Sequence, residues 1–155
     1  MADIRRATAA DIPALVEMGR ALHDESPRYK DMAYSDSKVA ALAERIMTGP
    51  MAQAAVILVA DIDGVLVGMF VAVIAERWFC DERYVTDLTV YVKPHHRGGR
   101  TFFRLLMAFE CWATEQGIAD KAIGVSTEIN AEQTVCAYKR LGYRLAGYTM
   151  VKHGN

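Results

Sequence analysis

The segment from Tyr84 to Leu106 constrains the fold more than any other part of the chain, because it joins a strand pattern, a basic turn and a helix pattern. Residues 84–92, YVTDLTVYV, are rich in the β-branched and aromatic residues that favour strands. Pro94 ends this strand, since proline cannot donate to a ladder. The turn RGGR follows at 97–100, and apolar residues at helical spacing predict a helix over 101–116.

The turn before this helix has the composition of an anion-binding site. N–H groups at a helix start carry positive partial charge, and small residues let a phosphate approach the backbone. The two arginines of the turn add charge-assisted donors. A plain connection is the alternative reading, since glycine pairs punctuate many strand-to-helix links. The candidate pyrophosphate cradle comprises Arg97, Gly98, Gly99, Arg100, Thr101 and Phe102.

The rest of the chain predicts further helices and strands around this unit. Thr8 and Asp11 have the spacing of a capping box ahead of a helix that ends near residues 23–27. Asp63-Gly64 predicts a hairpin turn between two apolar runs. Asn130 and Gln133 are expected to cap a helix that closes at Leu141-Gly142. The other expected elements are a helix at about 35–47 and strands at 3–7, 54–61, 65–75, 122–126 and 143–151.

Bulk properties limit the class of protein. A chain of 155 residues is expected to form one domain, 1–155, with a substantial core. A net charge of -1 gives no reason to expect nucleic acid or a membrane surface as partner, and the longest apolar run, 54–60, is too short to span a bilayer. Cys80, Cys111 and Cys136 lack metal-ligand spacing, and their odd number disfavours a closed disulfide framework. We therefore expect no metal, and a cytoplasmic location.

Two sequence elements together resemble the GNAT superfamily of N-acetyltransferases. The first is similar to the family's acyl-CoA-binding motif, V-x-P-x-x-R-G-x-G-x-G/A, although Arg100 and Phe102 stand where the family usually has Gly and Gly/Ala. The second, residues 130–143, resembles the family's N-x(7)-Y-x-x-x-G-F/Y segment. The pair lies in the expected order and the resemblance covers most of the chain. The matching residues are Val92, Pro94, Arg97 and Gly98 in the first element, and Asn130, Tyr138, Gly142 and Tyr143 in the second.

This resemblance implies a mixed α/β GNAT-like fold, with a central twisted mixed sheet of about six to seven strands flanked by about four helices. It also implies acetyl-CoA as co-substrate. Backbone groups of Val90 and Val92 would contact the pantetheine arm where the strand splays from its neighbour. Asn130 would add a contact to that arm, and Tyr138 would protonate the departing thiolate.

The general base is not fixed by the resemblance. Asp87 is a candidate because it is the only carboxylate in the interior of the strand at 84–92, but it could instead pair locally with an arginine. Glu25 and His23 follow the first helix, where GNAT proteins commonly form the acceptor pocket; a solvated loop is the competing reading. Ser126 and Glu128 are weaker pocket candidates.

The leading functional hypothesis is acetyl transfer to a primary amine by direct attack, on a small-molecule or peptide acceptor. A non-catalytic acyl-CoA-binding or sensor module is the alternative. A nucleotide-binding domain is disfavoured, because the chain has neither GxxxxGK[ST] nor GxGxxG with a following acidic ribose ligand. The acceptor's identity and homodimer formation stay open.

Overall fold

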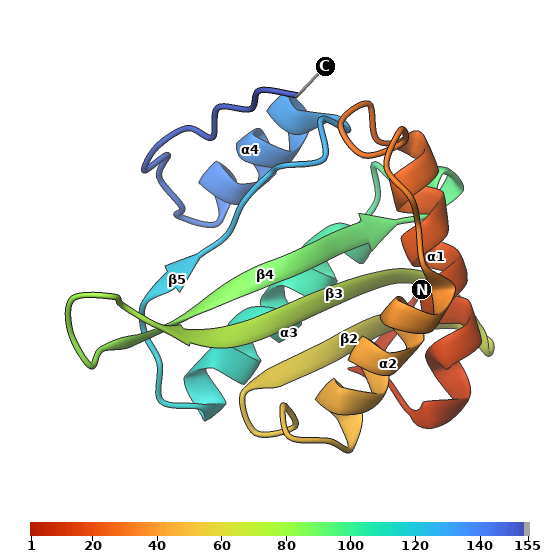
Figure 1. Cartoon of the computed structure of the whole chain (residues 1–155), viewed down its shortest axis with the longest axis horizontal. Coiled ribbons are helices and arrows are strands. Elements are labelled where there is room, and N and C mark those ends of the chain that lie inside the picture. The colour runs from red at the N-terminus through yellow and green to blue at the C-terminus, as the bar shows by residue number, and fades with distance from the viewer. Residues whose placement is uncertain (154–155) are drawn as a thin grey trace.

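The computed structural model describes residues 1–153 and consists of a five-stranded sheet with helices on both faces (Figure 1). The strands lie in the order β1-β2-β3-β4-β5. The first three pairs are antiparallel and β4 with β5 is parallel, so the predicted mixed sheet is confirmed. The elements are β1 (Asp3–Arg6), α1 (Ile12–Glu25), α2 (Asp36–Met47), β2 (Ala55–Ile62), β3 (Val65–Glu76), β4 (Arg83–Val92), α3 (Thr101–Glu115), β5 (Lys121–Ala122) and α4 (Ala131–Arg140), with short 3-10 turns at Ala9–Asp11 and Pro94–His96.

Each face of the sheet has its own apolar core. Helix α3 covers one face, where the rings of Phe70 and Phe109 stack with their centroids 4.6 Å apart. Helices α1 and α2 cover the other face (Figure 1). Gly68 permits the close approach of α3, because a Cβ there would lie 3.1 Å from a methyl group of Leu105 and 3.0 Å from a backbone oxygen.

Short-range signals in the sequence set several element boundaries. Asp63 and Gly64 both have positive φ, as the predicted tight hairpin turn requires. Thr8 and Asp11 form the predicted capping box. Asp11 also accepts two hydrogen bonds from Arg5, which bridges it to Asp61 on β2. These contacts fix the entry to α1 against the first two strands.

Two strand predictions are wrong in extent. Strand β5 covers two residues instead of the predicted 122–126, since the chain beyond Ala122 diverges from β4 (Figure 1). The predicted strand at 143–151 is absent, and this segment runs beside α4 as a coil (Figure 1). Tyr148 and Met150 are 86% and 90% exposed in it. A strand needs a ladder partner, and the two-residue β5 offers almost no edge. The sheet therefore has five strands rather than six or seven.

Strand β4 contains a bulge that decides which side chains face the site. Val71 pairs with Thr89 and Ala72 pairs with Asp87, so Leu88 is the extra residue. The bulge shifts the alternation of side chains along the strand. As a result Asp87 and Val90 share the face that packs toward α3, although strict alternation would separate them.

Candidate active site

A cleft of about 960 Å³ opens where β4 and the chain after β5 diverge. Its walls are the second half of β4, residues 124–134, helix α4 and the turn at 97–99 that precedes α3. Strand β4 pairs with β5 only through Val85 and Thr86, so the splay expected from the resemblance is present. Beyond Thr86 this edge of β4 therefore has no strand beside it among the described residues.

The turn at one end of the cleft presents a run of main-chain donors. Within the described structure, the N–H groups of residues 98–103 find no backbone or side-chain acceptor. Arg100 is the N-cap of α3 and forms no side-chain cap. Gly98 has φ of 76°, which favours glycine, and a Cβ on Gly99 would project into open space. Free N–H groups at a helix start form a ready site for an anion such as a pyrophosphate.

Arg97 does not point freely into this turn. Its Nε donates to the Val92 carbonyl oxygen at 2.7 Å, and its two Nη atoms donate to the Glu25 carboxylate at 2.5 and 2.7 Å. The ion pair raises the pKa of Arg97 and lowers the pKa of Glu25. Arg97 therefore joins the end of β4 to the end of α1, next to the N–H groups of the turn.

The side chain of Asp87 lies in the splay between β4 and the chain after β5. Its Oδ1 accepts a hydrogen bond of 2.8 Å from the Gly124 N–H, so the carboxylate spans the gap that a ladder would otherwise fill. Burial raises the pKa of Asp87 above its usual range, partly offset by this hydrogen bond. A carboxylate with a raised pKa that lines a cleft suits proton transfer near neutral pH.

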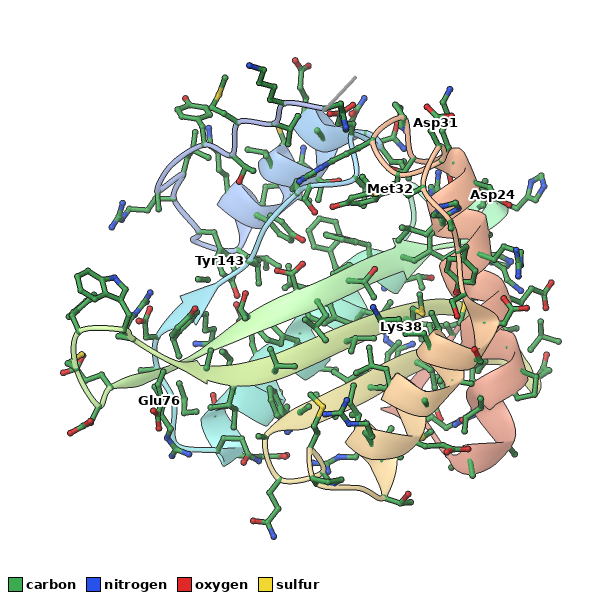
Figure 2. The ribbon with its side chains drawn as sticks, in the orientation of Figure 1. Asp24, Asp31, Met32, Lys38, Glu76 and Tyr143 are labelled. Atoms are coloured by element: carbon green, nitrogen blue, oxygen red, sulfur yellow. The ribbon has the colours of Figure 1, made fainter. Side chains whose placement is uncertain are left out.

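Tyr138 comes from the last turn of α4 and lines the same cleft as Asp87. It is 6% exposed, and its ring packs against Phe102 and Tyr143 at centroid distances of 5.7 and 5.8 Å. Figure 2 labels Tyr143, which lies between α4 and the sheet. Burial, and then the charge of Asp87, raise the pKa of the Tyr138 phenol, which therefore stays protonated at neutral pH.

The segment after α1 closes one side of the cleft. Ser26 Oγ donates to the Thr127 carbonyl at 2.6 Å, Arg28 donates to the Ser126 carbonyl at 3.0 Å, and the Tyr29 hydroxyl donates to Ser126 Oγ at 3.2 Å. Ser26 is fully buried. These contacts attach the chain after α1 to the chain after β5, 97 to 101 residues later.

The structure brings most of the predicted site residues to this one cleft. Glu25, Arg100 and Thr101 do not line it: Glu25 pairs with Arg97, and the other two lie at the adjacent start of α3. His23 lies outside it, and both of its ring nitrogens are within 2.9 Å of protein oxygens. The predicted residues that line the cleft are Asp87, Val90, Val92, Arg97, Gly98, Gly99, Phe102, Ser126, Asn130 and Tyr138.

One predicted local role is wrong. Asn130 occupies the N-cap position of α4, but it has a left-handed backbone with φ of 46° and its side chain forms no cap. Its carbonyl oxygen accepts from Thr134 instead. Sequence reasoning also missed Tyr29, Glu132 and Cys136 in the cleft wall. Glu132 and Cys136 are four residues apart, a spacing that puts both on one face of α4 and could have indicated that they belong together.

Residues 1–153 contain no cluster of three His, Cys, Asp or Glu side chains suited to a metal ion. Over the same range, no helix is both long and apolar enough to traverse a bilayer.

Comparison with known proteins identifies the family. The model of the Acetyltransferase (GNAT) family matches residues 19–143. Among solved structures, AAC(6')-Iy in complex with the bisubstrate analog CoA-S-monomethyl-acetylneamine shares 21% identity at a TM-score of 0.76, covering 100% of this chain and 99% of that one. A predicted acetyltransferase with acetyl-CoA from Clostridium acetobutylicum shares 17% identity at a TM-score of 0.76, with coverage of 99% and 96%.

An aminoglycoside acetyltransferase, HMB0005, from an uncultured soil metagenomic sample shares 15% identity at a TM-score of 0.72, with coverage of 100% and 99%. No curated protein matches the chain. Likeness at these identities shows a common fold, whereas the family model spans most of the sequence. The protein therefore belongs to the GNAT acetyltransferase family.

Proposed function

We propose that this chain transfers an acetyl group from acetyl-CoA to the nitrogen of a primary amine. The observation that supports this most directly is the single cleft that holds an anion cradle at one end and the Tyr138–Asp87 pair further along β4. Membership of the GNAT acetyltransferase family supports the choice of reaction. Two structural relatives, one with acetyl-CoA and one with a CoA bisubstrate analog, support the choice of donor.

The donor is held mainly by backbone groups in this proposal. The N–H groups of residues 98–103, which include Thr101, would bind the pyrophosphate, and the exposed Arg100 would add a charge-assisted contact. The free edge of β4 at Val90 and Val92 would pair with the amides of the pantetheine arm, as an added strand would. Asn130 on the opposite wall would supply a polar contact.

The transfer needs one base and one acid. The amine nitrogen attacks the thioester carbonyl carbon, so a C–N bond forms and the C–S bond breaks. Asp87 takes the proton that the nitrogen loses, and Tyr138 donates its phenolic proton to the departing sulfur. Asp87 then returns its proton through solvent to the Tyr138 phenolate, and both groups regain their starting states.

The charge of Asp87 and the acidity of Tyr138 are coupled in a direction that favours this order of proton transfers. The negative charge of Asp87 raises the pKa of Tyr138. When Asp87 accepts the amine proton, that charge disappears and the Tyr138 phenol becomes a stronger acid. The proton uptake at one side of the reaction therefore assists proton donation at the other.

Glu25 has a different place in this proposal. Its carboxylate is engaged by Arg97 and its pKa is lowered, so it is a poor proton acceptor. We assign it an electrostatic role, in which its carboxylate offsets part of the positive charge of Arg97 beside the cradle. Asp87 is the better candidate for the base because it lines the cleft and its pKa is raised.

Two measurements test the proposal. Acetyl-CoA should raise the melting temperature more than equal concentrations of ATP or NAD do. A panel of small amines, an aminoglycoside, amino acids and peptides should then be screened for release of free CoA. Binding of acetyl-CoA without release by any acceptor would instead favour an acyl-CoA sensor, and stronger stabilisation by ATP or NAD would contradict both.

A further inference from the structure

A second cavity, of about 340 Å³, opens from the active-site cleft between the sheet and helices α1 and α2. Four residues line both spaces and so mark their junction: Leu22, Tyr29, Leu88 and Thr89. This junction lies immediately after Asp87 on β4. Leu88, one of these four, is 50% exposed.

The deeper wall of this cavity is apolar. Leu15 contributes from α1, Leu42 and Ile46 from α2, and Ile57 and Val71 from the sheet. Within the described residues, no carboxylate, lysine or arginine lines it. A volume of 340 Å³ lies at the lower end of the range for small-molecule sites, so one alkyl or aryl group would fill it.

The polar side chains at the cavity are already used inside the protein. The Tyr34 hydroxyl donates to the Val16 carbonyl at 2.9 Å, and the Tyr29 hydroxyl donates to Ser126 Oγ at 3.2 Å. His23 has its ring nitrogens 2.9 Å from Asp24 Oδ1 and 2.8 Å from the Met32 carbonyl. Figure 2 labels these two partners, Asp24 and Met32. A charged ligand group in this cavity would lose its hydration and gain little in return.

The aromatic side chain of Tyr34 forms part of the cavity wall and is fixed by its contacts. Tyr34 lies over Gly19, where a Cβ would come 2.4 Å from its hydroxyl oxygen. Its ring also packs against His23, with centroids 5.3 Å apart, and beneath the Arg20 guanidinium at 4.9 Å. These contacts hold the Tyr34 ring at the edge of the cavity, so the ring does not occupy the space between the two helices.

We propose that the acceptor is an amine carrying an apolar aliphatic or aromatic group, which enters this cavity while its nitrogen stays beside Asp87. The inference rests on the acetyl transfer proposed above. A group in the cavity must connect to the rest of the ligand at the junction, where Leu88 and Thr89 follow Asp87 along β4 and all three residues line the cleft. This placement favours the amine over the acyl chain as the owner of that group. A polycation finds no counter-charge in the cavity.

The first test is a series of straight-chain amines from methylamine to hexylamine, with acetyl-CoA as donor and CoA release as readout. Each methylene that enters the cavity should raise kcat/KM about three- to fourfold, until the cavity is full. Spermidine should be a poorer acceptor than hexylamine. A flat or falling series overturns the apolar-acceptor inference while leaving acetyl transfer intact. Absence of CoA release with every amine overturns the transfer itself and this inference with it.

A matched pair of variants locates the effect. Leu42→Phe fills the cavity from α2 and should lower the ratio of kcat/KM for hexylamine over methylamine at least tenfold. Leu145→Phe makes the same change at a 49% exposed position outside both cavities and should keep the wild-type ratio. If Leu42→Phe does not fold, Val39→Phe on the same helix takes its place. An unchanged ratio in the folded cavity variant overturns the inference.

A third arm separates the acceptor from the acyl donor. Acetyl-, butyryl- and hexanoyl-CoA should be compared with methylamine as a fixed acceptor. The proposal expects no gain from the longer acyl chains. A rise with acyl length that Leu42→Phe abolishes would assign the cavity to the acyl group and overturn the proposal.

Discussion

The Arg97 guanidinium donates to both oxygens of the Glu25 carboxylate, 72 residues earlier in the chain, at 2.5 and 2.7 Å. The same side chain donates to the Val92 carbonyl at the end of β4. A residue expected to meet phosphate thus has a carboxylate as its partner in the protein. The cation and the anion together set the local charge beside the main-chain donors of the turn.

We expect the two partners to affect acetyl-CoA binding in opposite directions. Arg97→Ala should weaken binding by roughly tenfold and flatten its dependence on salt, since a charge-assisted contact is lost. Glu25→Gln removes the competing negative charge and should tighten binding about two- to fivefold at low salt. Titration calorimetry at two ionic strengths measures both. Equal weakening in the two variants would mean that the ion pair acts only by holding the turn in place.

Tyr138→Phe should reduce turnover by roughly ten- to a thousandfold, the usual range for a general acid. The substitution keeps the ring that packs against Phe102 and Tyr143, so acetyl-CoA affinity and the melting temperature should change little. Single-turnover rates are the measurement, because they isolate the chemical step. A wild-type rate in this variant would make water the proton donor to the thiolate.

Asp87→Asn should lower kcat/KM by roughly a hundredfold at pH values where Asp87 is ionised, as expected for loss of a general base. The asparagine oxygen can still accept from the Gly124 N–H, so the splay should survive. The wild-type and variant profiles should converge on the acid side, below the raised pKa of Asp87. Parallel profiles across the whole pH range would remove Asp87 as the base.

The same variant should be more stable than the wild type at neutral pH. Burial raises the pKa of Asp87, so the folded state binds its proton more tightly than the unfolded state does. Stability from this group is present below the unfolded pKa of about 4 and falls as pH rises through the folded value. The melting temperature of Asp87→Asn, measured relative to that of the wild type, should therefore rise as pH rises. An equal difference from the wild type at acid and neutral pH would contradict this account.

Asp11 should stabilise the fold in the opposite pH sense. Its hydrogen bonds with Arg5 lower its pKa from 3.8 to about 2. The stability it contributes is present above pH 3.8 and is lost as pH falls toward 2. Asp11→Asn should cost on the order of 1 kcal/mol at pH 7, after solvent screening, and progressively less below pH 4. Urea unfolding at both pH values measures it, with Asp3→Asn, a surface aspartate, as the control.

The predictability of this protein from its sequence depended on the range of the interactions involved. The Asp63-Gly64 turn, the Thr8–Asp11 box and the strand–turn–helix unit are local, and all three were correct. The strand at 143–151 has a strand-like pattern, but its formation depends on a distant edge that β5 does not provide. Local pattern could not reveal that absence.

The site residues divide in the same way, between those indicated by local motifs and those brought together by long-range contacts. Tyr138 and the turn at 97–99, which the sequence motifs singled out, line one cleft. The pairing of Glu25 with Arg97, and of Asp87 with Gly124, joins segments far apart in sequence and leaves no trace in either segment alone. The α1–α2 cavity could not be predicted for the same reason, because its walls come from five helices and strands and from the loop between α1 and α2.

The bulge at Leu88 gives the protein a natural position at which to observe ligand binding. A bulge interrupts the ladder locally, so amide protons around Leu88 should exchange with solvent faster than those of β4 that are hydrogen-bonded to β3. The same residue lines both the cleft and the apolar cavity. Hydrogen exchange at this one position can therefore register an occupant of either space, even for a ligand that is never turned over.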